Sequence, residues 1–269
     1  MSFEKGFFNV GYLDSLSYRD TFVHRLDPRV KLIATIIFIV CVVSLPKYEV
    51  SGLLPFFIFP IFMTTVGEIP VRYILKKLLV VSPFVVFIAV FNPFIDRKVL
   101  LSVGGLEITG GWVSLFSIII KFVLTIGAAL LLVATTSFIG ICEALGRMKV
   151  PEVFVIQLLF LYRYLFVLLE EAFRMVRARD ARSFGKRGFG LKPFIHLITV
   201  LLIRTLRRAE RIYGAMVSRG FRGKIVLPRT HRLTVTDTVF LCISAILFLT
   251  FRSLNISTII GDFISGWLS

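Results

Sequence analysis

Five long apolar runs constrain this chain more than any other feature of its sequence. They cover residues 32–45, 50–66, 78–95, 112–138 and 237–250, and 57% of the whole chain is hydrophobic. A helix needs roughly 20 apolar residues to cross the hydrocarbon core of a bilayer, so flanking residues must lengthen the shorter runs. The apolar residues are consecutive and do not alternate with polar ones, which favours membrane helices over the strands of a membrane barrel. The predicted fold class is therefore all-α, a polytopic membrane protein with about five transmembrane helices.

The positive charge of the chain is concentrated in one segment. Residues 139–236 contain 19 basic and 6 acidic residues, a net charge of +13, whereas the whole chain carries +16. Basic segments stay on the cytoplasmic side of a membrane, so we predict a cytoplasmic location for this one. The same rule explains the charge without nucleic acid as a partner, so we predict that the chain binds none.

The charge pattern divides the chain into three parts. Residues 1–138 hold the first four transmembrane helices, residues 139–236 form the cytoplasmic segment, and residues 237–269 hold a C-terminal transmembrane helix. The loop after the third apolar run, residues 96–111, is neutral. We therefore predict an N-terminus inside the cell and a C-terminus outside it.

Two stretches of the cytoplasmic segment begin apolar and end basic. The charged residues of each stretch share one helix face; they are Arg163, Glu170, Arg174 and Arg177 in the first, and Arg204, Arg207, Arg208 and Arg211 in the second. Three glycines and Pro193 separate the stretches. We predict two long amphipathic helices whose apolar starts lie against the membrane. In an alternative interpretation, residues 150–169 and 194–206 cross the bilayer, but the polar residues of the first range and the shortness of the second disfavour it.

Each predicted helix ends in a small residue, an arginine and another small residue. The two triplets are Ala181, Arg182, Ser183 and Ser218, Arg219, Gly220. Small neighbours let the backbone approach a partner closely, and a guanidinium forms forked hydrogen bonds with a carboxylate or a carbonyl group. Two such tips predict two sockets on a partner. A plainer interpretation is that the arginines complement the dipoles of the helix C-termini, worth about 0.3–1 kcal/mol each.

Sequence motifs for catalysis and cofactor binding are missing from the chain. No phosphate-binding loop of the form GxxxxGK[ST] occurs, so no nucleotide site is predicted. The histidines and cysteines are scattered and have no metal-ligand spacing; they are His24, His196, His231, Cys41, Cys142 and Cys242. We predict no metal site, no cofactor and no enzyme.

Lys121 lies inside the fourth apolar run. An ionisable residue there is a candidate functional group, but it can instead snorkel outward or pair with a neighbouring helix. Together with Asn92 and Gln157, it is one of the few polar groups that a stand-alone carrier or channel could use.

The segment "HRLDPRVK", residues 24–31, precedes the first apolar run. A basic cluster at this place follows from the positive-inside rule alone. We expect Asp27 to form a local ion pair with Arg29 or Lys31, worth under about 1 kcal/mol if the pair is exposed.

The sequence "HRLDPRVKLI", the pair of long cytoplasmic helices and the ending "AMVSRG" together resemble the transmembrane T component of energy-coupling factor (ECF) transporters, the EcfT/CbiQ family, in which cobalt-transport permease subunits form one branch. The resemblance covers about residues 20–255. The second triplet is similar to the Ala-Arg-Gly type of signature in that family, with Ser218 in place of the alanine. The first triplet departs more, because Ser183 stands where the family usually has glycine, and Arg179 is an alternative for its arginine.

This resemblance implies a subunit of an ABC-type importer. In such transporters, two ABC-type ATPases hydrolyse ATP in the cytoplasm, and the coupling helices of the T component dock on them through the arginine tips. The apolar parts of these helices carry a membrane-embedded substrate-binding (S) subunit, which captures a vitamin or a cobalt or nickel ion.

The resemblance therefore implies a multi-pass protein of the cell inner (cytoplasmic) membrane, with residues 139–236 as its cytoplasmic coupling segment. Two competing hypotheses are a stand-alone membrane carrier or channel, and a membrane enzyme that acts on lipid.

Overall fold

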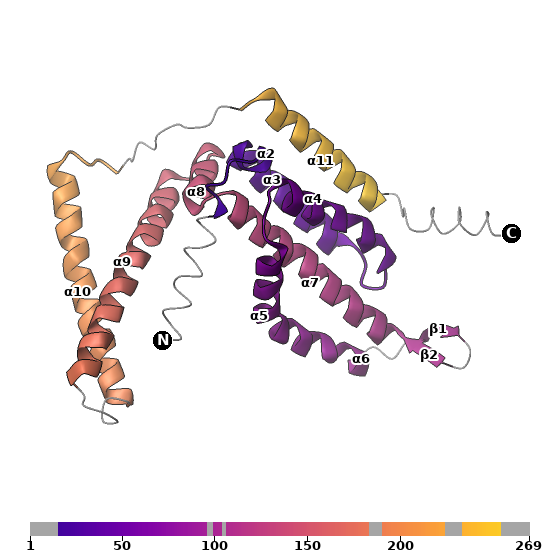
Figure 1. The fold of residues 1–269 in the computed structure, drawn as a ribbon, viewed down its shortest axis with the longest axis horizontal. Coiled ribbons are helices and arrows are strands. Elements are labelled where there is room, and N and C mark those ends of the chain that lie inside the picture. Colours follow the sequence, from indigo (N-terminus) through magenta and orange to yellow (C-terminus); the bar gives the residue numbers. More distant parts are fainter. Residues whose placement is uncertain (1–15, 96–98, 104–105, 183–189, 224–232, 254–269) are drawn as a thin grey trace. The chain divides into compact units, whose positions relative to one another are not determined.

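The structure of the chain is a computed structural model, which describes residues 16–95, 99–103, 106–182, 190–223 and 233–253. It divides into two compact units. The membrane unit consists of residues 1–144 and 230–269, and the two-helix unit consists of residues 145–229. Figure 1 shows that almost all described elements are helices. The predicted all-α class of a polytopic membrane protein is confirmed.

The membrane unit contains a series of helices of very different lengths. In chain order these are α2 (Phe22–Arg25), α3 (Pro28–Ser44), the 3₁₀ helix η1 (Ser51–Phe57), α4 (Ile58–Val66), α5 (Val71–Val90), α6 (Asn92–Ile95), α7 (Gly110–Thr135), α8 (Phe138–Arg147) and α11 (Val235–Ser253). The last three residues of α8 already belong to the two-helix unit.

A short antiparallel β-ribbon joins α6 to α7. Its strands are β1 (Val99–Val103) and β2 (Leu106–Thr109), in a register that pairs Val103 with Leu106. The sequence predicts only a loop between residues 96 and 111. Two strands of five and four residues are too short for hydrophobic alternation to identify them.

Four helices among the described residues are long and apolar enough to cross a membrane, and they are α5, α7, α11 and α9 (Glu152–Arg182) of the two-helix unit. The first two predicted spans are shorter: α3 has 17 residues, and the second is divided between η1 and α4. At 1.5 Å per residue, α3 is about 25 Å long, slightly less than the hydrocarbon core. The inclusion of α9 leaves open the alternative in which residues 150–169 cross the bilayer.

Proline positions in the membrane unit fit the local structure. Pro28 occupies the first turn of α3, and Asp27 caps this helix by accepting a hydrogen bond from the Arg29 backbone N–H at 2.8 Å. Pro83 lies inside α5 and cannot donate to the carbonyl of Leu79. The Ser82 hydroxyl donates to that carbonyl at 3.0 Å instead, so the acceptor is satisfied within the apolar helix.

The core of the membrane unit forms around α3, which packs against α7 and α11. Its centre is a group of aromatic rings in edge or tilted contact: Phe38, Phe56, Phe59, Phe248 and Phe251. These rings come from α3, η1, α4 and α11, so they join helices from both ends of the chain.

The two-helix unit is an antiparallel pair formed by α9 and α10 (Leu191–Ser218). Arg204 of α10 donates to the carboxylate of Glu171 of α9 at 2.6 Å and thereby joins the middle parts of the helices. Figure 1 shows α9 and α10 side by side, with the C-terminal end of α9 next to the N-terminal end of α10. At 1.5 Å per residue, each helix is about 40–46 Å long.

Candidate functional site

The second arginine triplet forms a complete helix-terminating motif. The Phe221 N–H donates to the Met216 carbonyl at 3.0 Å, and the Gly220 N–H donates to the Val217 carbonyl at 2.9 Å. These two bonds define a Schellman motif, which requires a left-handed residue directly after the helix cap. Gly220 supplies it with φ = +82°. The glycine of the triplet thus ends α10, and it leaves Arg219 exposed at the cap position.

The first arginine triplet lies at the end of α9. Ala181 and Arg182 are its last two residues and both are exposed, whereas Ser183 lies outside the described residues. Arg179, the alternative arginine, contacts the carboxylate of its neighbour Asp180 at 2.9 Å and is only partly exposed. Arg182 is thus the last described residue of α9, and Arg179 lies three residues before it.

The two tips lie at opposite ends of the helix pair. Arg182 lines a groove together with Pro193 and His196 at the start of α10. Phe221, two residues beyond Arg219, lines another groove together with Val153 at the start of α9. Because the helices are antiparallel, nearly the whole length of α10 separates the tips, about 40 Å. The sequence predicted two tips but could not place them relative to each other.

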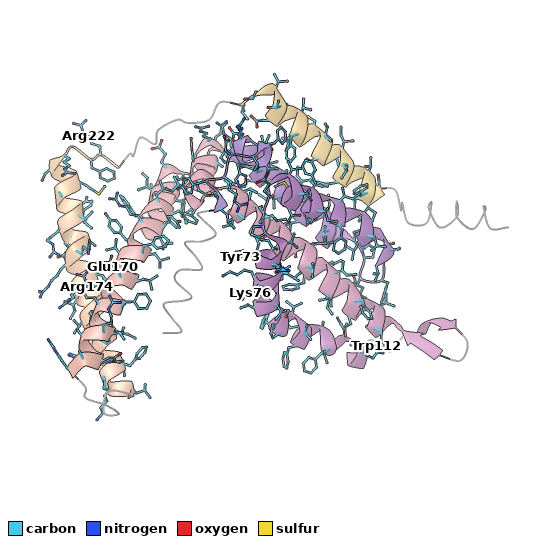
Figure 2. All side chains as sticks on the ribbon, viewed as in Figure 1. Tyr73, Lys76, Trp112, Glu170, Arg174 and Arg222 are labelled. Atoms are coloured by element: carbon cyan, nitrogen blue, oxygen red, sulfur yellow. The ribbon has the colours of Figure 1, made fainter. Side chains whose placement is uncertain are left out.

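The groove near Arg182 is strongly basic and has a volume of about 600 Å³. Its cationic side chains are those of Arg174, Arg179, Arg182 and Arg204, and its acidic residue is Glu171. Figure 2 shows Glu170 and Arg174 on α9, where their side chains pair at 3.2 Å. Both members of that pair are two-thirds exposed, so it contributes little to stability.

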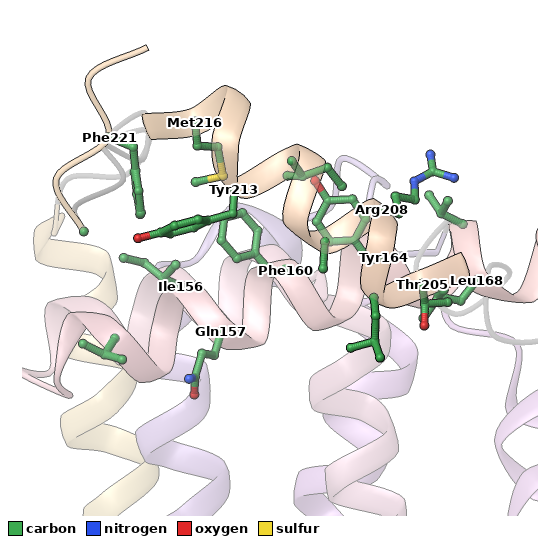
Figure 3. Close-up of a pocket in the computed structure, with 16 residues that line it drawn as sticks. Ile156, Gln157, Phe160, Tyr164, Leu168, Thr205, Arg208, Tyr213, Met216 and Phe221 are labelled. Atoms are coloured by element: carbon green, nitrogen blue, oxygen red, sulfur yellow. The ribbon is translucent and has the colours of Figure 1, made fainter. Parts of the chain in front are cut away.

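The groove at the other end of the pair is apolar and has a volume of about 670 Å³ (Figure 3). Aromatic and aliphatic side chains of α9 and α10 line it, among them Phe160, Tyr164, Tyr213, Met216 and Phe221. Large apolar side chains are also exposed on the outer surfaces of both helices, for example Leu161, Leu191 and Leu202. A helix pair with this much uncovered apolar surface is suited to contact lipid or another membrane protein.

Lys121 is paired rather than free. Its Nζ donates to the backbone carbonyl of Leu45, the C-cap residue of α3, at 2.6 Å. This agrees with the interpretation that Lys121 pairs with a neighbouring helix. The other polar groups considered for a carrier, Asn92 and Gln157, lie in different units.

The scattered histidines and cysteines stay apart in the described parts of the chain. His24 and His196 belong to different units, and His231 lies outside the described residues. Cys41 and Cys142 are buried and Cys242 is exposed, all three as free thiols. Within the described ranges, no three His, Cys, Asp or Glu residues come close enough together to hold a metal ion.

A buried polar cluster at the start of α3 was only partly anticipated from the sequence. Asp27 and Lys31 are 1% and 2% exposed, so the local pair expected for Asp27 is not a surface feature. Arg29 approaches Asp27 at 3.7 Å, and the Asp27 backbone N–H donates to Asp237 of α11 at 2.9 Å. Sequence reasoning missed Asp237, because a contact across 210 positions leaves no local pattern.

The fold thus defines the class of all-α, multi-pass membrane proteins, here with an added pair of long antiparallel helices. The chain is a member of the CbiQ family of cobalt transport proteins, whose family model matches residues 19–232. It is 30% identical over 232 residues to the energy-coupling factor transporter transmembrane protein EcfT of Ruminiclostridium cellulolyticum, covering 81% of this chain and 86% of that protein.

Two further relatives are similar to this chain over most of their length. The EcfT protein of Streptococcus thermophilus is 27% identical over 249 residues, which cover 86% of this chain and 92% of the relative. An uncharacterised protein of Methanocaldococcus jannaschii is 29% identical over 235 residues, which cover 84% of this chain and 80% of the relative. The predicted resemblance is confirmed, and the chain is a transmembrane component of the ECF transporter type.

Proposed function

We propose that this chain is the scaffold that couples ATP hydrolysis by two partner ABC-type ATPases to substrate uptake through a membrane-embedded S subunit. The placement of Arg182 and Arg219 at opposite ends of one antiparallel helix pair carries this proposal. Two arginines about 40 Å apart cannot bind in a single site on a partner, but they can contact two separate subunits. The ATPase-coupling residues are Ala181, Arg182, Ser183, Ser218, Arg219 and Gly220.

The orientation of the helices in the membrane unit supports a cytoplasmic position for the coupling segment, residues 139–236. Asp237 and Arg252 of α11 contact the start and the end of α3 respectively, so these two helices run parallel. Lys31 of α3 bonds to the last residue of α7, which therefore runs antiparallel to both. If α3 and α11 both leave the cytoplasm, α7 returns to it and delivers the basic segment there, as the positive-inside rule requires.

The apolar surface of the two-helix unit supports an S subunit as the membrane-embedded partner. Residues 1–138 and 237–269 supply the remaining membrane helices of the scaffold. In this proposal the chain sits in the cytoplasmic membrane, and the vitamin or the cobalt or nickel ion binds to the S subunit. ATP hydrolysis belongs to the partner ATPases, so this chain is not itself an enzyme.

Charge reversal at each tip tests the proposal. The variants Arg182→Glu and Arg219→Glu are expressed together with ABC-type ATPases and an S subunit from the same organism, and ATPase retention is measured after purification from the membrane. We expect each variant to insert normally and to lose one ATPase contact, because a carboxylate cannot replace the forked guanidinium donor. Arg222→Glu is the matched control, since Arg222 is exposed just beyond the second triplet (Figure 2). Full retention of both ATPases by the double tip variant would refute the proposal.

A further inference from the structure

The groove near Arg182, which we call the basic groove, has one basic wall and one apolar wall. The basic wall belongs to the second half of α9, from which Arg174, Arg179 and Arg182 line the groove. The opposite wall belongs to the first half of α10, from which Leu197 lines the groove. Residues 193–203 of α10 contain no Asp, Glu, Lys or Arg. The basic groove therefore offers cations and apolar surface to the same ligand.

The cations of the basic groove outnumber its acidic groups. Four arginines and one glutamate line it, which gives the lining a net charge of +3. Two further acids, Glu170 and Asp180, lie outside the lining and pair with Arg174 and Arg179. Within the described residues, no ion pair involves Arg182. Ion pairs between exposed or partly exposed side chains are weak, so an anion of higher charge density can replace these carboxylates.

A phosphate group matches the basic wall. A guanidinium binds phosphate oxygens through two parallel hydrogen bonds, and the charge on both groups strengthens these bonds. Isolated phosphate would leave the apolar wall uncovered, however. Large apolar side chains in this part of α10 are exposed, for example Leu191, Phe194 and Ile198. Such a surface is suited to hydrocarbon, so the two walls together match a ligand that contains both a phosphate and a hydrocarbon chain.

The sequence of α9 indicates where such a ligand comes from. This helix is long and apolar enough to cross a membrane, and residues 153–169 contain a single charged residue, Arg163. Residues 170–182 contain seven charged residues, four of which are arginines. Basic residues that directly follow an apolar membrane segment attract anionic lipid headgroups. The arginines of the basic groove occupy this position on α9.

We propose that the basic groove binds an anionic phospholipid, whose phosphate contacts Arg174 and Arg179 of α9 and whose acyl chain lies along the first half of α10. This inference goes beyond the proposed function, in which Arg182 contacts an ATPase and the neighbouring arginines have no assigned role. A zwitterionic lipid would cover the same apolar wall, but its positive choline group would offset the attraction of its phosphate to the arginines.

Binding of defined lipids to the purified full chain tests this proposal. The delipidated chain in nonionic detergent receives palmitoyl-oleoyl phosphatidylglycerol or the corresponding phosphatidylcholine, and native mass spectrometry gives the dissociation constant of the first bound lipid. We expect phosphatidylglycerol to bind more tightly. Arg174→Gln combined with Arg179→Gln should weaken its binding about 25-fold, because each basic residue near an anionic lipid contributes about a factor of five. Phosphatidylcholine binding should not change.

Arg207→Gln combined with Arg211→Gln is the matched control. It removes the same charge from the same helix pair, at exposed positions of α10 that do not line the basic groove. It should weaken phosphatidylglycerol binding no more than about twofold, through the general charge alone. If the α9 double variant cannot be purified, the single variant Arg174→Gln decides, with an expected weakening of about fivefold. Equal weakening in test and control variants, or equal affinity for the two lipids, would overturn the proposal.

Competition with glycerol phosphate and with inorganic phosphate distinguishes a lipid from a soluble anion. Both share the contacts with the arginines but lack the acyl chain, so we expect them to displace the lipid only at much higher concentrations than phosphatidylglycerol itself. Displacement at similar concentrations would overturn the assignment to a lipid. All these measurements are made without ATPases. The ATPase retention of Arg182→Glu and Arg219→Glu therefore decides the proposed function separately.

Discussion

Lys31 and Lys121 join α3 and α7 at the two ends of this helix pair in the same way. The ammonium of each lysine donates a hydrogen bond to a backbone carbonyl at the C-terminal end of the other helix. Lys31 of α3 reaches Thr135 at the end of α7, and Lys121 of α7 reaches Leu45 at the end of α3. Fourteen residues separate the lysine from the carbonyl on each helix. A cation at a helix C-terminus also complements the helix dipole, so each lysine stabilises its partner helix both by a hydrogen bond and by its charge.

The first prediction concerns these two lysines. Lys121→Met should lower the free energy of unfolding by about 1.5–3 kcal/mol, the range for a hydrogen bond that involves a charged group. Lys31→Met should cost more, because it removes the buried cation that attracts both Asp27 and Asp237 and leaves Asp27 with Arg29 alone, at 3.7 Å. Thermal unfolding in detergent, followed by tryptophan fluorescence, measures both effects. The control is Lys76→Met on the exposed surface of α5, which should change the transition by less than either (Figure 2).

The second prediction concerns the end of α10. Gly220→Ala should weaken the Schellman motif by about 1 kcal/mol, because a residue with a Cβ disfavours φ = +82° even where space is open. Hydrogen exchange of the Phe221 amide measures the effect. Gly214→Ala, inside the same helix and also without a neighbour within 4 Å, should instead stabilise the helix by about 1 kcal/mol. Identical exchange in the two variants would contradict this account.

The third prediction concerns the turn between α8 and α9. Lys149 has φ = +67°, and the Val150 N–H bonds back to the Leu145 carbonyl at 3.2 Å, as in a Schellman motif. Lys149→Val should destabilise the chain by more than about 1 kcal/mol, because β-branched residues are strongly disfavoured in this conformation. Lys149→Gly should not destabilise it. Unfolding temperatures of the two variants decide the matter, and equal losses would show that the backbone conformation is not the cause.

The fourth prediction concerns pH. Burial lowers the pKa of His24, and the positive charge of Lys31 lowers it further. The folded chain therefore binds this proton less readily than the unfolded chain, whose histidine titrates near pH 6.5. The stability that depends on neutral His24 is fully present above about pH 6.5 and is lost as the pH falls below it. His24→Gln should flatten the decline in unfolding temperature between pH 7.5 and 5.5, and a decline as steep as in the native chain would exclude His24 as its source.

The positions of most long helices could be predicted, because each helix has a simple local pattern in the sequence. Consecutive apolar residues indicated α5, α7 and α11, and the recurring charges with the intervening glycines and Pro193 indicated α9 and α10. Hydrophobicity alone left the role of residues 150–169 undecided, because α9 combines an apolar start with a charged end.

The contacts that organise the site could not be predicted in the same way. The partner of Lys121 is a backbone carbonyl, which no sequence pattern reveals. The partner of Asp27 lies at the far end of the chain, and the antiparallel pairing of α9 and α10 depends on how the chain turns between them. The two arginine triplets were visible in the sequence, but their separation is a property of the folded pair alone.

Two proteins bound to opposite ends of one helix pair cannot move independently of each other unless the pair bends. If Arg182 and Arg219 each bind a different ATPase, movement of one ATPase is transmitted to the other through α9 and α10. The two ATPases would then act in synchrony without contacting each other, because the helix pair connects them.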